Sequence, residues 1–141
     1  MTELADTSAW VWSRRPAYPE LRHAFDAALV AGELATCDMV RLELLYSARD
    51  PVELAEIRDE LAVLPDCPFG KQHWERALSV YEQLSVRGGL HQRSVKHPDL
   101  LIAVAAEAAG VAVLHYDEDY DRIAEITGQP TRWLAPAGSL R

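Results

Sequence analysis

The sequence predicts an α/β sandwich in which helices surround a small, mainly parallel central sheet. Short apolar segments alternate along the chain with longer segments of helical periodicity, a pattern typical of strands joined by helices. The clearest strand, residues 111–116, is rich in β-branched residues and follows Gly110, a residue type that commonly ends helices. The preceding helix, residues 98–110, contains a long apolar run without a polar face, so we expect it to be buried on all sides.

The first half of the chain is predicted to supply two strands and four helices. Asp6-Thr7-Ser8 favours the start of the first helix, and Asp38 is expected to cap the third. Gly32 ends the second helix and Asp50-Pro51 separates the third from the fourth. The predicted elements are a strand at 3–5, a helix ending at 14–16, a helix at 19–31, a strand at 34–37, a helix at 39–49 and an amphipathic helix at 54–64.

The second half is predicted to place a buried helix and strand between a helix with helical spacing of apolar residues and a short last helix. Helical spacing of apolar residues marks the segment 74–84, and its aromatic residues Trp74 and Tyr81 are expected in the core. Gly128 closes the last helix. The predicted elements are a loop at 65–68, a helix at 74–84, a loop that leads to Pro98, a helix at 98–110, a strand at 111–116, a helix at 119–126 and an edge strand at 131–134.

Length and composition predict one soluble globular domain that spans residues 1–141. Cys37 and Cys67 lack the spacing of zinc ligands or of a disulfide framework, so we expect two buried thiols in a reducing compartment. The first residues do not resemble a secretory signal, and the longest apolar run, 100–106, is far shorter than the roughly 18 residues of a membrane helix. A cytoplasmic protein without membrane association is therefore expected.

Charge is unevenly distributed along this acidic chain. The net charge of −8 counts against generic, charge-driven binding of nucleic acid. The window from residue 83 to residue 98 nevertheless contains no Asp or Glu, and its basic residues are Arg87, His91, Arg93, Lys96 and His97. A local basic patch thus precedes Asp99 at the start of the buried helix.

Four separated carboxylates are predicted to converge on one pocket. Asp6 and Asp117 each follow a strand and therefore point to the carboxyl edge of a parallel sheet, where functional crevices lie. Asp99 opens the buried helix and Glu43 lies on the helix after the second strand. Taken alone, Asp99 would be explained as a charge that compensates the helix dipole, and Glu43 as a surface residue.

Convergence of these carboxylates predicts a site for hard divalent cations. Two like charges about 4 Å apart repel by roughly 4 kcal/mol at an effective dielectric constant near 20, so cations are needed to keep the group ionised. All-oxygen ligands favour Mg²⁺ or Mn²⁺. Such ions activate water and stabilise charge on a phosphodiester, so the expected chemistry is nucleolytic.

Four acidic segments stand in a specific order and spacing: Asp6-Thr7-Ser8-Ala9, Arg41-Leu42-Glu43-Leu44, Pro98-Asp99-Leu100-Leu101-Ile102-Ala103 and Leu114-His115-Tyr116-Asp117-Glu118-Asp119-Tyr120. Together they resemble the motifs of PIN-domain ribonucleases, and more narrowly those of VapC toxins from bacterial type II toxin–antitoxin pairs. The resemblance covers essentially the whole chain. Tyr120 replaces the phenylalanine that commonly follows the last aspartate.

The resemblance implies a PIN-like α/β/α fold and an Mg²⁺- or Mn²⁺-dependent endoribonuclease that cuts structured RNA, commonly tRNA or rRNA. It also implies inhibition by a VapB-type antitoxin, and we expect a homodimer. Carried over by position, the catalytic residues and metal ligands would be Asp6, Glu43, Asp99 and Asp117. Asp119 would be a supporting carboxylate at the metal, and Ser8 would orient a ligand or water.

Two surfaces are candidates for partners. For the RNA backbone, the candidate phosphate contacts are Arg87, Arg93, Lys96 and His97, with a solvated basic loop as the alternative. For an amphipathic antitoxin segment, the candidate groove residues are Trp10, Trp12, Leu44, Leu45 and Tyr46, most of which are expected to be ordinary core.

Two other phosphoryl-handling folds fit the sequence poorly. A haloacid-dehalogenase-type phosphatase would have a second aspartate two places after Asp6, where Ser8 stands. A receiver domain would have paired acids after its first strand and a lysine after a late strand, where this chain has His115-Tyr116-Asp117. The remaining alternative is a PIN-fold protein that acts as a non-catalytic RNA-binding or protein-interaction module.

Overall fold

A computed structural model describes residues 2–89 and 91–141, and its four strands form one parallel sheet. The strand order is β2-β1-β3-β4. The parallel α/β architecture expected from the sequence is therefore confirmed, and the carboxyl ends of all four strands lie at the same edge of the sheet. The strands are β1 (Glu3–Ala5), β2 (Leu34–Ala35), β3 (Ala112–His115) and β4 (Thr131–Trp133).

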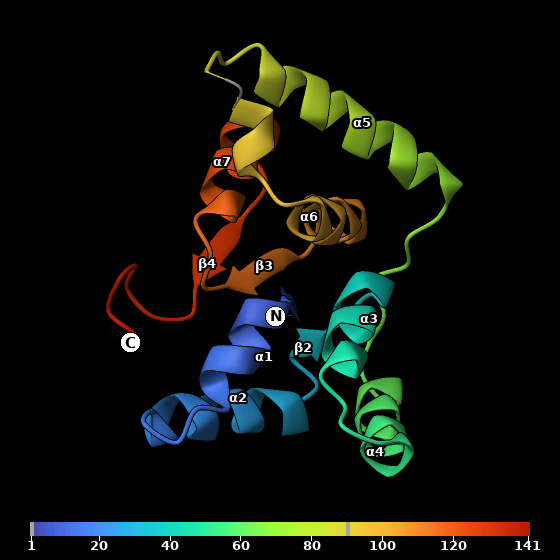
Figure 1. The fold of residues 1–141 in the computed structure, drawn as a ribbon, viewed down its shortest axis with the longest axis vertical. Helices are drawn as coiled ribbons and strands as arrows, with labels where there is room; N and C mark the ends of the chain where they lie inside the picture. Colours follow the sequence, from blue (N-terminus) through green and yellow to red (C-terminus); the bar gives the residue numbers. More distant parts are fainter. Residues whose placement is uncertain (1, 90) are drawn as a thin grey trace.

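Helices cover both faces of this sheet (Figure 1). Helices α1 and α2 lie on one side, α5, α6 and α7 lie on the other, and α3 packs with α4 near β2. In the described part of the chain, every helix is too short or too polar to span a bilayer. The helices are α1 (Thr7–Ser13), α2 (Pro19–Val30), α3 (Asp38–Tyr46), α4 (Pro51–Ala62), α5 (Lys71–Ser85), the 3₁₀ turn η1 (His91–Ser94), α6 (His97–Ala109) and α7 (Asp119–Thr127).

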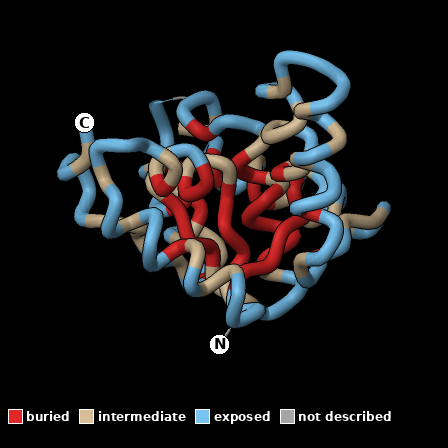
Figure 2. The backbone as a smooth tube through the Cα atoms, turned by 90° about the horizontal axis from the view of Figure 1, so that it is seen from below, coloured by how far each residue is buried: buried red, intermediate tan, exposed pale blue. Residues whose placement is uncertain are grey.

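Helix α6 is the centre of the core, as the sequence predicts. Six of its apolar residues, including Ile102 and Ala105, are buried, and Figure 2 shows the buried backbone running through the middle of the molecule. Pro98 lies in the first turn, where its missing N–H costs no hydrogen bond. Gly110 ends the helix with a φ of 71°, a left-handed conformation that L residues rarely adopt. The chain then turns directly into β3.

Some predicted boundaries differ from the structure. The strand predicted at 34–37 is only two residues long, because Thr36 instead forms an isolated bridge with Asp66 in the predicted loop 65–68. Asp38 lies inside α3, and its side chain pairs with Arg41 rather than capping the helix. The predicted loop before Pro98 contains η1, and Leu90 lies outside the described residues.

Helix α5 buries a narrower face than the sequence predicts. Trp74 is 52% exposed and Leu78 is 66% exposed, so the expectation of a core position was wrong for Trp74. The helix packs on α6 and α7 through Ala77, Val80 and Leu84. Helical spacing identifies an apolar face but does not say how much of that face a neighbouring element covers.

Candidate metal centre

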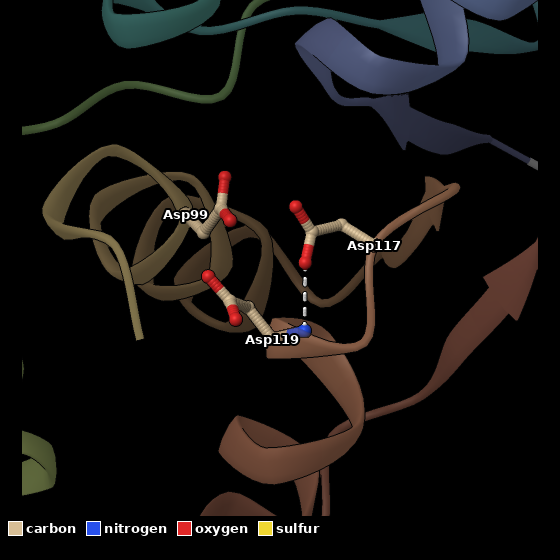
Figure 3. Close-up of side chains that lie close together, drawn as sticks. All are labelled: Asp99, Asp117 and Asp119. Carbon is tan, nitrogen blue, oxygen red and sulfur yellow. Dashed lines mark hydrogen bonds between the residues drawn. The ribbon is translucent and has the colours of Figure 1, made fainter. Parts of the chain in front are cut away.

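Three aspartates meet at the carboxyl edge of the sheet (Figure 3). One carboxylate oxygen from each of Asp99, Asp117 and Asp119 lies within 4.8 Å of the others. Asp99 comes from the first turn of α6, Asp117 follows β3, and Asp119 begins α7. We refer to these three residues as the carboxylate cluster. Asp99 and Asp119 are 6% and 2% exposed, so two of the three carboxylates are withdrawn from water.

The turn between β3 and α7 fixes the orientation of Asp117. The backbone N–H of Asp119 donates a 2.9 Å hydrogen bond to Asp117 Oδ1, and the N–H of Asp117 donates one of 3.1 Å to His115 Nδ1. Since His115 Nδ1 accepts this bond, the proton of the neutral imidazole lies on Nε2. Burial lowers the pKa of His115 to about 4, so this ring is a neutral support at physiological pH.

Asp99 is the carboxylate of the cluster whose charged form is most strongly disfavoured. Burial, a hydrogen bond with Asp119 and the charge of Asp117 raise its pKa to about 8. Its buried Oδ2 has no hydrogen-bond donor among the described residues, although the Lys96 ammonium lies 3.4 Å away. A buried oxygen without a hydrogen bond, surrounded by other carboxylates, matches the ligand set of a hard divalent cation. The cluster therefore has the chemistry needed to bind such an ion.

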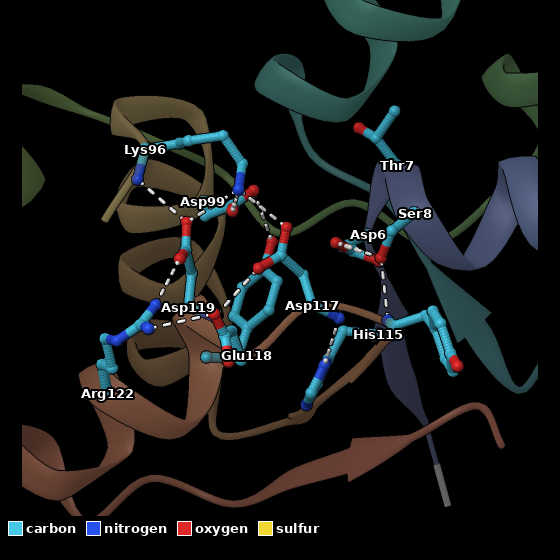
Figure 4. Close-up of polar contacts among 12 residues, drawn as sticks. Asp6, Thr7, Ser8, Lys96, Asp99, His115, Asp117, Glu118, Asp119 and Arg122 are labelled. Atoms are coloured by element: carbon cyan, nitrogen blue, oxygen red, sulfur yellow. Dashed lines mark hydrogen bonds and ion pairs between the residues drawn. The ribbon is translucent and has the colours of Figure 1, made fainter. Parts of the chain in front are cut away.

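Two cations flank the carboxylate cluster (Figure 4). The Nζ atom of Lys96 lies 2.8 Å from Asp117 Oδ2 and 3.0 Å from Asp119 Oδ2. Arg122 reaches the other side, where Nη1 lies 3.1 Å from Asp119 Oδ1. Burial opposes ionisation of Asp119, but its hydrogen bonds with Asp99 and Lys96 outweigh burial and lower its pKa. Asp119 thus has more donors than either of its neighbours in the cluster.

Asp6 faces the cluster from the end of β1 (Figure 4). It caps α1 as predicted, because Oδ1 accepts a 2.9 Å hydrogen bond from the N–H of Ala9. Ser8 donates to the same oxygen at 2.7 Å and accepts from the N–H of Tyr116 at 2.8 Å, so it links α1 to the end of β3. Burial raises the pKa of Asp6 to about 6 despite these bonds. Its charge also contributes to the raised pKa of Asp99.

Glu43 lies outside the carboxylate cluster. Its Oε1 accepts a 2.7 Å hydrogen bond from Thr7 Oγ1, which joins α3 to the start of α1 next to Asp6. The side chain is half-buried. The structure therefore brings together Asp99, Asp117 and Asp119, places Asp6 opposite them, and ties Glu43 to the residue that follows Asp6.

Three residues near the cluster were not assigned a role at the site from the sequence. Tyr120 is fully buried and donates a 3.4 Å hydrogen bond to Asp99 Oδ1. His115 stacks against Tyr120 with ring centroids 4.8 Å apart. Arg122 follows Asp119 by three positions and Glu118 by four, a helical spacing that could have predicted both of its ion pairs. Nothing in the sequence pattern indicates the contacts of Tyr120 and His115.

The basic window contributes one residue directly to the cluster, namely Lys96. Arg87 donates to the backbone oxygen of Glu125 at 3.1 Å, so it links the segment that follows α5 to α7. His97 packs edge-on against Tyr81 with centroids 5.5 Å apart, and Arg93 is exposed on η1. The four candidate phosphate contacts therefore lie in four different environments.

An apolar groove lies between α3, α5 and α6. A hollow of about 180 Å³ and one of about 290 Å³ share Trp74 and Leu101, and the second also contains Leu78 and Tyr81. The antitoxin groove considered from the sequence involves other residues. Of these, Trp10 is core and packs on Phe25, Trp12 contacts Tyr116, Leu44 and Leu45 are half-buried, and Tyr46 is exposed.

Comparison with known families identifies this arrangement. The model of the PIN domain matches residues 4–126. The chain belongs to the PIN-domain family. All four predicted acidic positions lie within the matched PIN segment, which also contains the complete carboxylate cluster.

Curated PIN-domain relatives match the chain from end to end. Ribonuclease VapC18 of Mycobacterium tuberculosis is 48% identical over 140 residues, which cover 99% of this chain and 100% of that protein. Ribonuclease VapC51 of the same organism is 39% identical and covers 97% of this chain and 96% of its own length. The chain is therefore a VapC-family PIN-domain protein.

Solved structures support the same fold. A chain in the crystal structure of DNA-bound VapBC from Salmonella typhimurium matches with a TM-score of 0.73 at 18% identity and covers 96% of this chain and 100% of its own length. A chain of FitAcB from Neisseria gonorrhoeae matches with a TM-score of 0.60 at 15% identity and covers 92% of this chain and 96% of its own length. At these identities the likeness concerns the fold alone.

Proposed function

We propose that this PIN-domain protein is a metal-dependent endoribonuclease toxin of the VapC type that hydrolyses phosphodiester bonds of structured RNA, such as tRNA or rRNA. The observation that carries the proposal is the carboxylate cluster, in which Asp99 and Asp117 approach each other and one buried oxygen of Asp99 has no hydrogen-bond donor within residues 2–89 and 91–141. Identity of 48% over the whole length of a protein named a ribonuclease supports the same reaction.

The proposed metal ligands are Asp99 and Asp117, with Asp6 completing the site from the end of β1 and Asp119 as a supporting carboxylate. A bound Mg²⁺ or Mn²⁺ would activate a water molecule and stabilise the charge that develops on the phosphodiester. Ser8 orients Asp6, and the neutral His115 ring holds the backbone of Asp117. Glu43 has a more distant role in this proposal, since its hydrogen bond to Thr7 fixes the start of α1 beside Asp6.

The RNA backbone would approach over the basic window. Arg93 is the most available phosphate contact, since Arg87 is bonded to Glu125 and His97 packs on Tyr81. A local patch of this kind compensates for the net charge of −8, which repels a polyanion over most of the surface.

The proposed protein partners are a VapB-type antitoxin and a second copy of this chain, in the cytoplasm. The exposed apolar residues of the groove, above all Trp74 and Leu78, support binding of a protein segment rather than of a charged ligand. A solved structure from Mycobacterium tuberculosis that shares the fold is titled a member of the VapBC family of toxin–antitoxin systems. This groove therefore replaces the surface around Trp12 and Tyr46 as the proposed docking site.

Cleavage of purified tRNA and rRNA by antitoxin-free protein tests the proposal. We expect discrete fragments with Mg²⁺ or Mn²⁺, no fragments with EDTA, and a rate at least about a hundredfold lower for Asp99→Asn, a loss of roughly 2.7 kcal/mol of transition-state stabilisation. Asp59→Asn on exposed α4 is the matched control and should cleave at the parent rate. Intact RNA in every reaction from folded protein would contradict the enzyme and favour the non-catalytic alternative.

A further inference from the structure

Lys96 has a position that the sequence does not predict. It precedes α6 directly, and its backbone N–H donates a 2.9 Å hydrogen bond to Asp119 Oδ2. Its side chain turns back over the carboxylate cluster, so that Nζ lies 2.8 Å from Asp117, 3.0 Å from Asp119 and 3.4 Å from Asp99 (Figure 4). Among the ion pairs of the described residues, Lys96 provides the one cation that contacts all three carboxylates.

We propose that Lys96 is a displaceable internal counter-cation of the carboxylate cluster. In the metal-free protein its ammonium contacts the three aspartates and offsets part of their negative charge. Binding of a divalent cation moves the ammonium outward, where it can contact a phosphate of the RNA. This inference rests on the proposed metal-dependent function, because it needs a cation that competes for the same oxygens.

Electrostatics requires that the two cations exclude each other. Asp117 Oδ2 and Asp119 Oδ2 both lie within 3.0 Å of the ammonium. A divalent ion bound to these oxygens would lie close to the ammonium and repel it, since like charges at such a distance interact unfavourably even near a protein surface. Occupation of the cluster by one cation therefore weakens binding of the other.

The anchoring of Lys96 allows its head to move while its backbone stays in place. The side chain is 61% exposed, so the ammonium can reach water by rotation about side-chain torsions without disturbing the core. The backbone hydrogen bond to Asp119 keeps the start of α6 fixed. Arg122 differs in this respect, because its side chain is 26% exposed and pairs with both Glu118 and Asp119.

Lysine side-chain NMR tests the displacement in the wild-type protein. The chain contains two lysines, Lys71 and Lys96, so Lys71→Met assigns both ammonium signals of ¹⁵N-labelled protein. We expect a protected Lys96 signal in EDTA that disappears or moves toward the exposed Lys71 signal as Mg²⁺ is added. An unchanged Lys96 signal in Mg²⁺-saturated protein would overturn the proposal.

Metal binding to Lys96→Met provides the second test, with Lys71→Met as the matched control. Met keeps most of the length of the side chain but removes its charge. At pH 8.5, where protons compete least for the carboxylates, calorimetry should give Mg²⁺ binding about tenfold tighter in Lys96→Met than in the wild type. The midpoint of thermal unfolding should also rise more on Mg²⁺ addition in this variant than in the wild type.

The two proposals fail in different ways. Equal Mg²⁺ affinity in the wild type, Lys96→Met and Lys71→Met would overturn the role of Lys96 while leaving the metal site intact. Absence of Mg²⁺ and Mn²⁺ binding in all three folded proteins would contradict the metal site itself, and the role of Lys96 with it.

Discussion

At the scale of single residues, the site is defined by carboxylates whose folded environment disfavours their charge. Burial raises the pKa of Asp99 to about 8 and that of Asp6 to about 6. Such groups reduce the stability of the metal-free protein, and a bound cation would reverse this cost. These aspartates therefore lower the stability of the metal-free protein and at the same time provide ligands for a metal ion.

The raised pKa of Asp99 predicts that the free energy of unfolding depends on pH. Folded Asp99 keeps a proton up to pH of about 8, whereas the unfolded residue loses it near pH 4, so the metal-free protein loses stability as pH rises between these values. His115 has the opposite effect, because its lowered pKa removes stability as pH falls from about 6.5 to about 4. Between pH 6.5 and pH 8 the effect of Asp99 is thus largely isolated.

Urea unfolding in EDTA measures this effect. From pH 6.5 to pH 8 we expect the free energy of unfolding of the wild type to fall by up to about 1.4 kcal/mol per pH unit, and that of Asp99→Asn to fall much less. Asp59→Asn should keep the slope of the wild type. Parallel slopes for the wild type and Asp99→Asn would show that Asp99 titrates normally in the folded protein.

Ser8 carries a second prediction at this scale. Its hydroxyl is bonded to both Asp6 and the N–H of Tyr116, so Ser8→Ala leaves a buried carboxylate and a backbone donor without that partner. We expect a loss of about 1 kcal/mol in the free energy of unfolding and slower RNA cleavage at saturating Mg²⁺. Ser85→Ala, which removes an exposed hydroxyl bonded within its own helix, is the control for both measurements. An activity equal to the parent would remove Ser8 from the proposed site.

At the scale of elements, α6 positions the site because residues 99–106 of this helix are mostly buried. Asp99 lies in its first turn, and the fully buried Ala105 lies further along the helix. Interiors at this density tolerate added volume poorly. The rigidity of this helix fixes the position of Asp99 relative to Asp117 on the next strand.

Overpacking of α6 tests this account. Ala105→Leu should reduce the free energy of unfolding by about 1 to 3 kcal/mol. Ala108→Leu, on the exposed end of the same helix, should change it by less than about 0.5 kcal/mol. Denaturant unfolding of both variants is the measurement, and equal stabilities would show that α6 is not packed as described.

Elements with strong local patterns were predictable from the sequence, whereas their surroundings were not. The apolar run of α6 and the β-branched residues of β3 predict these two elements directly from the sequence. The two elements place Asp99 and Asp117 at the carboxyl edge of the sheet. The exposure of Trp74 depends on how α5 sits on its neighbours, which periodicity does not encode. The same holds for the hydrogen bond between Thr7 and Glu43 and for the ion pairs of Lys96 with the carboxylate cluster. These contacts join segments that are far apart in the sequence and meet only in the tertiary structure.

At the scale of the whole molecule, the net charge is negative, although the segment 83–98 contains basic residues and no acidic ones. The net charge is −8, yet η1 presents Arg93 to solvent close in sequence to the cluster. A polyanion should therefore bind through a few local phosphate contacts, and its affinity should depend on salt through those contacts alone.

Arg93→Ala tests this expectation. We expect weaker RNA binding and a salt-dependence slope that is smaller by about 1, as for the loss of one phosphate contact. The measurement is fluorescence anisotropy with labelled RNA in EDTA over a series of salt concentrations. Arg58→Ala on exposed α4 is the control and should keep both the affinity and the slope. If Arg93→Ala also keeps the affinity and the slope of the parent, the basic window of residues 83–98 is a solvated loop.

The central claim is that the carboxylate cluster holds the catalytic divalent ion, and anomalous diffraction from crystals soaked in Mn²⁺ tests it most directly. We expect an anomalous peak in contact with Asp99 and Asp117, together with movement of the Lys96 ammonium away from them. Soaks should use a Mn²⁺ concentration that supports RNA cleavage in solution. If crystals soaked at that concentration have no peak at these two aspartates, the account of the site is contradicted.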